Sequence, residues 1–407
     1  DKNPYLQYFK NIPLAEDLKE YQESCQSATQ KLRQEIKDKK VAPIDIIFEK
    51  DDLKYFEELS NAISKYKKVL VLGVGGSSLA GKTLAALKDQ DKVEFLESID
   101  PTTVKSALDK TDFNNTFFLV ISKSGETIET ICQTLVVIEK IKKLEIKNFS
   151  KQFLFVTGSE ENSIAKIAKE IGAKIANHPE KIGGRYSCFS IVGLLPALLC
   201  GINIKEVRNG ANKIVQNFLT NDDILNSCAI QICLYEKGFT SSVIMPYIDN
   251  LKNFTDWYRQ LWAESLGKSG FGSTPINSMG TVDQHSQLQL YLEGPKDKFF
   301  TFLTQENHPN DFLVKDLEPC PTLFGGKKLS DIVKIEQETT IEVLNQKNLP
   351  IRIFEIEKLN EEVLGGLMMQ MFLETILISY TKEINPFDQP AVELRKNLAK
   401  KILNENG

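Results

Sequence analysis

Val69-Leu70-Val71-Leu72, followed by Gly73-Val74-Gly75-Gly76, is the stretch of this sequence that decides the fold. Four consecutive apolar residues indicate a strand buried on both faces, because a strand with one exposed face alternates apolar and polar side chains. The glycines that follow are typical of the turn between a parallel strand and a helix. We therefore expect a strand, a glycine turn and then a helix from Ser78 to Leu87.

The same alternation continues toward the C-terminus. Short apolar runs separated by stretches of helical spacing predict an α/β protein, with each parallel sheet flanked by helices. A helical stretch near 205–237 divides the runs into two sets, so two sheets of similar type are expected. The predicted strands are 69–72, 93–96, 116–121 and 153–156 in the first set, and 242–248, 298–304 and 351–356 in the second.

The ends of the chain differ from this central part. Residues 5–66 are polar with helical spacing, which predicts a helical N-terminal arm. Residues 385–390 contain two prolines and interrupt the pattern before a final amphipathic C-terminal helix at 392–404. The expected segments are an N-terminal arm (1–50), a first α/β domain (51–203), a second α/β domain (204–384) and a C-terminal segment with its helix (385–407).

Composition excludes several classes of protein. The chain has 407 residues and a net charge of −5, which offers no general attraction for nucleic acid or an anionic membrane. Its seven cysteines form no C-x-x-C pair, which favours reduced thiols and no metal site. The longest apolar run, 191–202, is too short to span a bilayer, and the N-terminus lacks the pattern of a signal peptide. We expect a cytoplasmic protein without nucleic-acid or membrane partners.

A carboxylate lies in an amide-rich setting between Trp257 and Pro295. Gln260 and Glu264 are one helical turn apart and share a face, so an amide and a carboxylate can converge on one small polar ligand. A carboxylate is the usual side chain for moving a proton on and off carbon. His285, one of three histidines, follows in the same region.

Hydroxyl side chains follow the predicted strand 116–121. Ser122, Ser124, Thr127 and Thr130 precede or begin a helix, and such a loop can hold a phosphate with neutral donors and the helix dipole. A hydroxyl turn that merely caps the helix is the alternative.

The segment Gly76 to Thr83 matches the nucleotide-binding P-loop pattern. In a P-loop the first glycine directly ends the strand and the lysine starts the helix, whereas here Gly73 already ends the strand. We therefore regard nucleotide chemistry as a weak alternative. A dinucleotide site is weaker still, because Ser78 replaces the third glycine of that motif.

Five blocks in this order resemble the glucose-6-phosphate isomerase family, from about residue 45 to 402. The resemblance implies two sugar-isomerase (SIS-type) domains, interconversion of D-glucose 6-phosphate and D-fructose 6-phosphate through a cis-enediol(ate), no cofactor or metal, and a homodimer with shared active sites. The blocks are 73–77, 122–130, Gly183-Gly184-Arg185-Tyr186-Ser187, 264–268 with 284–285, and Phe387-Asp388-Gln389-Pro390-Ala391-Val392-Glu393 with Lys396.

The resemblance also implies a role for each residue of the site. Glu264 is the expected base and Arg185 lies beside the developing oxyanion. His285 and Lys396 assist ring opening, and Glu129 orients His285. The substrate and its phosphate are expected to contact Gly76, Ser77, Ser122, Lys123 through its backbone, Ser124, Thr127, Gln260 and Gln389.

Two positions depart from the family pattern. Glu126 stands where threonine is more usual, and its carboxylate would repel a phosphate unless it points away. Ala391 occupies a position that is commonly glycine. An isomerase that also accepts mannose 6-phosphate and a non-catalytic sugar-phosphate sensor remain alternatives, although a sensor could dispense with Glu264, His285 and Lys396.

Overall fold

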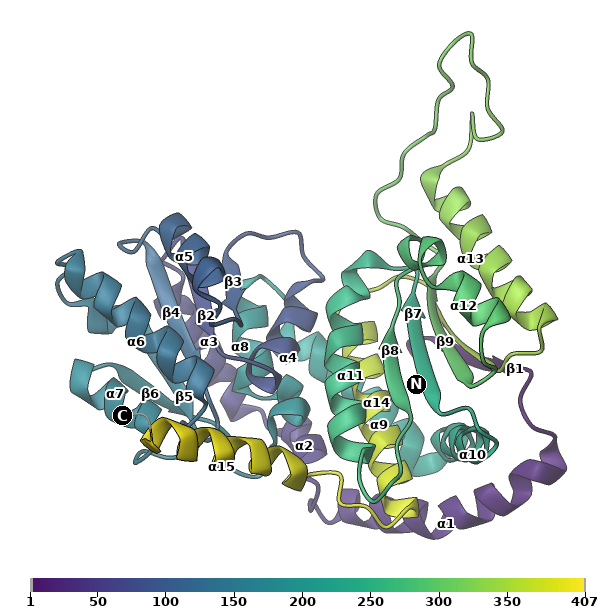
Figure 1. Ribbon diagram of the computed structural model, residues 1–407, viewed down its shortest axis with the longest axis horizontal. Coiled ribbons are helices and arrows are strands. Elements are labelled where there is room, and N and C mark those ends of the chain that lie inside the picture. Colours follow the sequence, from purple (N-terminus) through teal and green to yellow (C-terminus); the bar gives the residue numbers. More distant parts are fainter. Residues whose placement is uncertain (1–2, 406–407) are drawn as a thin grey trace.

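The computed structural model describes residues 3–405 and contains two five-stranded sheets flanked by helices (Figure 1). This confirms the expected α/β class. In the first sheet the order is β3-β2-β4-β5-β6, and every neighbouring pair is parallel. Its strands are β2 (Lys68–Leu72), β3 (Val93–Leu96), β4 (Thr116–Ile121), β5 (Phe153–Thr157) and β6 (Lys174–Asn177).

The helices around the first sheet begin at side chains that suit a helix N-terminus. Asp100 accepts the backbone N–H groups of Thr102 and Thr103, and Asn162 and Ser190 cap later helices in the same manner. The helices are α2 (Ala42–Asp45), α3 (Asp51–Ile63), α4 (Gly76–Ala85), α5 (Pro101–Lys110), α6 (Ile128–Lys143), α7 (Ser163–Ile171) and α8 (Ile191–Leu199), with α8 packed on α4.

The second sheet has the order β1-β10-β9-β7-β8, and its edge strand β1 is antiparallel to β10. The predicted helical N-terminal arm contains the long helix α1 (Ala15–Lys37), but its residues 6–10 form strand β1 instead of helix. A five-residue edge strand is determined by pairing with distant β10 rather than by its own periodicity. The strands are β1 (Leu6–Lys10), β7 (Ser241–Pro246), β8 (Thr274–Asn277), β9 (Lys298–Gln305) and β10 (Ile351–Ile356).

The remaining helices include those around the second sheet and the C-terminal helix α15. The helical stretch predicted near 205–237 is two helices, because the chain leaves helical geometry at Asn221 and restarts at Asp223. The helices are α1 (Ala15–Lys37), α9 (Ile204–Thr220), α10 (Asp223–Glu236), α11 (Lys252–Leu266), α12 (Leu288–Glu293), α13 (Leu329–Gln346), α14 (Glu361–Thr381) and α15 (Pro390–Glu405).

Helix α14 lies at the centre of the molecule. It is long and apolar enough to cross a membrane, but 94% of its apolar window is buried inside the protein, against α1, α9, α10 and α11. The apolar cluster around it contains Val71 and Ile121 from the first sheet and Ile244 and Phe354 from the second. One continuous core therefore joins the two sheets.

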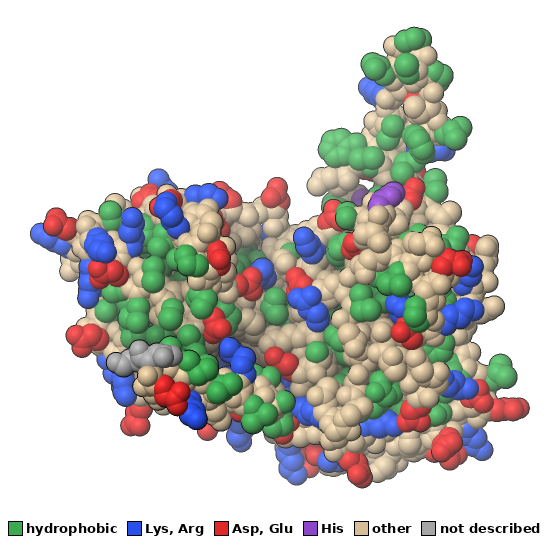
Figure 2. Space-filling view, in the orientation of Figure 1, with side chains coloured by type: hydrophobic (Ala, Val, Ile, Leu, Met, Phe, Trp, Pro, Cys, Tyr) green, Lys and Arg blue, Asp and Glu red, His purple; other side chains and the backbone are tan. Residues whose placement is uncertain are grey.

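A long irregular segment, 306–328, projects from the body between β9 and α13 (Figure 1). Figure 2 shows apolar side chains along this projection. Clustered exposed apolar side chains are a common feature of interaction surfaces. The exposed side chains are Phe312, Leu313, Leu317, Leu323 and Phe324.

A fully buried ion pair joins the second sheet to α14. Arg352 of β10 donates to Glu374 Oε2 at 2.8 Å, and both side chains have 0% exposure. Burial would raise the pKa of the Glu374 carboxyl, but Arg352 and the amide donors of Gln370 and Gln231 hold that pKa below its usual value. Glu374 is therefore an ionised carboxylate within the core.

Removal of one partner of this pair should strongly destabilise the protein. We expect Arg352→Met to lower the free energy of unfolding by about 3–5 kcal/mol, because it leaves an uncompensated buried carboxylate. The double variant Arg352→Met/Glu374→Leu should recover at least about half of that loss. Urea unfolding followed by circular dichroism measures both. A double variant as unstable as the sum of the two single variants would contradict this interpretation.

Candidate active site

A cleft of about 770 Å³ lies where the carboxyl ends of β2, β4 and β5 meet α11 and α15. Its volume suits a small-molecule ligand. Eleven of the thirteen residues expected at the site line it: Gly76, Ser77, Lys123, Ser124, Thr127, Glu129, Arg185, Gln260, Glu264, Gln389 and Lys396. Ser122 and His285 do not line it.

The floor of the cleft depends on close contact between two glycine segments. A Cβ atom on Gly76 would lie 2.2 Å from the carbonyl carbon of Gly184, so no larger residue fits without moving the backbone. Ser187 Oγ donates to the carbonyl of Gly76 at 3.2 Å and holds the two segments together. The segment that follows β2 is thereby fixed against the one that carries Arg185.

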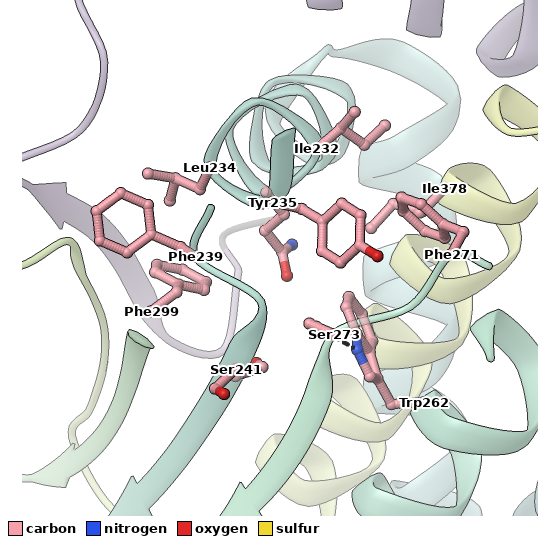
Figure 3. A pocket seen from close by; sticks show the side chains of 12 residues that line it. Ile232, Leu234, Tyr235, Phe239, Ser241, Trp262, Phe271, Ser273, Phe299 and Ile378 are labelled. Atoms are coloured by element: carbon pink, nitrogen blue, oxygen red, sulfur yellow. Dashed lines mark hydrogen bonds between the residues drawn. The ribbon is translucent and has the colours of Figure 1, made fainter. Parts of the chain in front are cut away.

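Helix α11 presents two different faces. Gln260 and Glu264 face the cleft, and Gln260 Nε2 donates to Glu264 Oε1 at 3.3 Å. Trp262 points the other way, into an aromatic cavity, where its Nε1 donates to Ser273 Oγ at 2.9 Å (Figure 3). That cavity has a volume of about 20 Å³, room for about one water molecule. It is too small for a sugar phosphate.

The Arg185 guanidinium connects three parts of the site. It is 2% exposed, and its Nη1 lies 3.3 Å from Glu264 Oε2 and donates to Gln389 Oε1 at 2.8 Å. Its Nε donates to Ser265 Oγ at 2.8 Å. Its Nη2 donates to the carbonyls of Pro386 and Asp388. A permanent positive charge therefore lies beside the Glu264 carboxylate.

Lys268 fastens the segment that precedes α15. Its ammonium group lies 2.9 Å from Asp388 Oδ1 and also donates to the carbonyl of Asn385. Burial lowers the pKa of Lys268, while Asp388 opposes that shift. The sequence block 264–268 thus carries a residue that faces the cleft and another that holds the C-terminal segment in place.

The loop after β4 has the geometry of an anion site. It enters α6 at Thr127, so backbone N–H groups of the first helical turn face the cleft. Ser122 is buried and makes a 3.1 Å hydrogen bond with Thr127 Oγ1, and it accepts the Gly125 N–H at 3.1 Å. Ser122 therefore shapes the loop from beneath. Burial lowers the pKa of the Lys123 ammonium in the same loop.

Gly125 is required by the packing of this loop. Its φ is +66°, and a Cβ atom there would lie 2.0 Å from the Asn162 side chain. Asn162 in turn caps α7 and donates to Thr157 Oγ1 at 2.8 Å. The loops after β4 and β5 are thus packed directly on each other.

The Glu126 carboxylate is engaged at the N-terminus of α7. Its two oxygens accept the Ser163 N–H at 2.8 Å and the Ser163 hydroxyl at 2.9 Å. A carboxylate in this position is stabilised by the helix dipole. Glu126, which stands where threonine is more usual, is therefore bound by Ser163. It also lines the cleft.

Lys82 does not occupy the position of a P-loop lysine. Helix α4 already starts at Gly76, so Lys82 lies in its last turn, and its ammonium pairs with Glu97 Oε2 at 2.5 Å. Ser78 Oγ donates to the other oxygen of Glu97 at 2.6 Å. This arrangement agrees with the argument from the sequence against nucleotide chemistry.

Helix α15 forms one wall of the cleft. It contributes Lys396, whose ammonium lies 2.7 Å from Glu393 Oε1, together with Arg395 and Lys400. Sequence interpretation missed the last two. Arg395 precedes Lys396 directly and Lys400 follows it by one helical turn, so their positions relative to Lys396 could have indicated them. A lysine-rich helix is, however, normally a solvated surface.

His285 lies outside the cleft of its own chain. It ends a short 3-10 helix, Val282–His285, where its side chain is exposed. Glu129 lines the cleft, whereas His285 is not among the residues that line it. One chain therefore does not bring these two residues together.

His178, which directly follows β6, is fully buried behind the loop of Lys123. Its Nδ1 lies 3.1 Å from the Pro179 carbonyl. Burial lowers the pKa of His178 to about 4, and the nearby charge of Lys123 lowers it further. The hydrogen bond to the Pro179 carbonyl opposes this shift. The imidazole is therefore neutral at pH 7.

Solved structures share this architecture of two parallel-type sheets flanked by helices. A hypothetical protein from Thermus thermophilus is 26% identical and superposes with a TM-score of 0.89, covering 98% of this chain and 100% of its own. Tagatose-6-phosphate ketose/aldose isomerase from Escherichia coli is similar in fold alone, with a TM-score of 0.53 at 12% identity over 84% of this chain and 91% of its own.

Sequence comparisons identify the family. The family model for phosphoglucose isomerase matches residues 57–407. A probable glucose-6-phosphate isomerase from Methanococcus maripaludis is 34% identical over 365 residues, which cover 87% of this chain and 82% of the relative. The chain belongs to the phosphoglucose isomerase family, and the enzyme class expected from the sequence is confirmed at the level of the family.

The buried His178 should make the protein sensitive to mild acid. In the unfolded chain histidine takes up a proton near pH 6.5, whereas folded His178 resists protonation until about pH 4. Stability is therefore full above pH 6.5 and falls by roughly 3 kcal/mol as the pH approaches 4. His178→Asn, which keeps a donor toward Pro179, should flatten this slope in thermal unfolding between pH 7 and 4.5. His308→Asn controls for loss of an imidazole, and equal slopes in all three proteins would refute the assignment.

Proposed function

We propose that this chain interconverts D-glucose 6-phosphate and D-fructose 6-phosphate by proton transfer between C2 and C1. The observation that carries the proposal is the pair formed by Glu264 and Arg185, 3.3 Å apart in a cleft that also contains an anion-binding loop. Membership of the phosphoglucose isomerase family supports the same reaction. The cleft lies between the two proposed domains, 51–203 and 204–384.

The phosphate binds at the loop after β4. Ser77, Ser124 and Thr127 supply hydroxyl groups, and the backbone N–H groups at the start of α6 supply donors aligned with the helix dipole. These donors are neutral, so recognition of the anion does not require a dense cluster of cations. The sugar then extends from the phosphate toward α11.

Glu264 carries the proton. In the open-chain aldose its carboxylate removes the proton from C2 and later delivers it to C1, while the hydroxyl proton moves from O2 to O1. The electron pair of the broken C–H bond passes into the cis-enediol(ate), whose oxygens carry the developing negative charge. Gln260 holds one Glu264 oxygen at 3.3 Å, which restricts the direction of the base.

Arg185 stabilises the enediolate because its charge is fixed in place before the substrate binds. Five of its contacts are to protein groups, so little reorganisation is needed during the reaction. Gln389, which accepts from Nη1 at 2.8 Å, is placed to hold a sugar hydroxyl.

Ring opening is assigned to Lys396 and His285. Lys396 lines the cleft on α15, but His285 is exposed outside it. We propose that His285 acts in the cleft of a second copy in a homodimer, where Glu129 orients it. The exposed apolar residues of segment 306–328 support association of two chains.

Loss of the Glu264 carboxylate should abolish most turnover. We expect Glu264→Gln to reduce kcat on the order of 10²–10⁴-fold with little change in KM, because the amide preserves shape but cannot accept the proton. A coupled assay of glucose 6-phosphate formation measures this, and exchange of the C2 hydrogen in deuterated water should fall in parallel. Glu293→Gln, on the protein surface, is the matched control. A wild-type chain that binds the sugar phosphate without turnover would instead identify a sensor.

Shared sites can be tested by complementation. Co-expressed Glu264→Gln and His285→Ala chains should regain about one quarter of wild-type activity, because half of the dimers are mixed and one of their two sites has both residues. Each variant alone should be nearly inactive. If His285 acts within its own chain, mixed dimers contain no intact site, and the absence of recovery would refute the shared arrangement.

A further inference from the structure

Another pocket, separate from the cleft, opens at the amino-terminal ends of the strands of the first sheet. Its volume is about 330 Å³, within the range of small-molecule sites. It lies where β4, β5 and β6 begin, whereas the cleft lies where strands of this sheet end. The lining residues are Leu59, Ala62, Ile63, Lys65, Phe117, Ser150, Lys151, Phe153, Leu154, Gly172 and Lys174.

The floor of this pocket is apolar and well supported. Phe117, Phe153 and Leu154 come from the central strands, and each is at most 5% exposed. Leu59 and Ile63 come from α3 and belong to the same apolar cluster as Phe117 and Leu154. An apolar group of a ligand would therefore contact side chains that are already fixed by the core.

Three lysines surround this floor. Lys65 follows α3, Lys151 lies in the 3-10 helix Phe149–Gln152, and Lys174 begins β6. Within residues 3–405 none of the three ammonium groups lies within 4.0 Å of a carboxylate oxygen, and no acidic residue lines the pocket. The chain as a whole is acidic, with a net charge of −5. Three unpaired lysines around one apolar pocket are therefore a local reversal of charge.

Two of these ammonium groups are held close to aromatic rings. Lys65 Nζ lies 5.2 Å from the centre of the Tyr66 ring, and Lys174 Nζ lies 5.2 Å from that of Tyr55. Tyr66 also donates its hydroxyl to the Lys151 carbonyl at 3.1 Å, which ties that lysine's segment to the end of α3. The positive groups are thus positioned by α3 and its neighbours.

We propose that this pocket binds an amphipathic monoanion, namely a medium-chain carboxylate whose alkyl chain lies on the apolar floor and whose carboxylate meets Lys65, Lys151 and Lys174. The apolar floor favours an alkyl group, and the lysines favour a negative charge. Neither a polar sugar phosphate nor an apolar cation matches both features. The proposal does not depend on the isomerase reaction.

Isothermal titration calorimetry with octanoate tests the proposal directly. Octanoate should bind one site per chain with a dissociation constant on the order of 1 mM or tighter, and binding should weaken as salt is added. Octylammonium, with the same chain and the opposite charge, should not bind. Acetate, which has the charge without the chain, should bind at least about tenfold more weakly. Equal binding of octanoate and octylammonium would overturn the proposal.

Variants locate the site. Lys151→Glu/Lys174→Glu should weaken octanoate on the order of tenfold or more. Lys110→Glu/Lys142→Glu changes net charge equally on exposed lysines elsewhere and should leave binding unchanged. Ala62→Trp fills the pocket from the exposed side of α3 and should abolish binding without lowering the unfolding temperature. Unchanged binding in both pocket variants would refute the site, and so would equal weakening in the lysine control.

Discussion

The Arg185 guanidinium is the constraint on which the site depends. A buried guanidinium must have its donors paired, since an unpaired buried charge is expensive. Its partners belong to α11 and to the segment 386–389, while Arg185 itself follows the glycine segment packed on Gly76. Its pairing therefore fixes the position of the base, of the C-terminal segment and of the phosphate side of the cleft relative to one another.

The core gives this arrangement a rigid base. Helix α14 is buried between α1, α9, α10 and α11, and one apolar cluster extends from Val71 to Phe354. Within this cluster, the ion pair of Arg352 and Glu374 fixes the position of β10 along α14. Any shift between the two elements would leave buried charges unpaired in a medium of low polarity. The two sheets therefore support the cleft as one unit.

Much of this could be predicted from local sequence. The continuous apolar run of β4 and the one-turn spacing of Gln260 and Glu264 can be recognised in the sequence alone. The edge strands β6 and β8 contain no apolar run longer than two residues, so the sequence does not predict them. Strand β1 is defined by a partner more than 340 residues away. The burial of His178 and the contact of Lys268 with Asp388 arise from long-range packing. The sequence names these residues, but their burial and contacts depend on segments that are distant along the chain.

The two faces of α11 have a practical consequence. The chain contains two tryptophans, Trp257 and Trp262, and both are buried on the helix that carries Glu264. Indole emission from the unmodified protein therefore originates entirely from this helix. Any ligand or substitution that displaces α11 will change an intrinsic optical signal, and no dye or label needs to be attached to follow it.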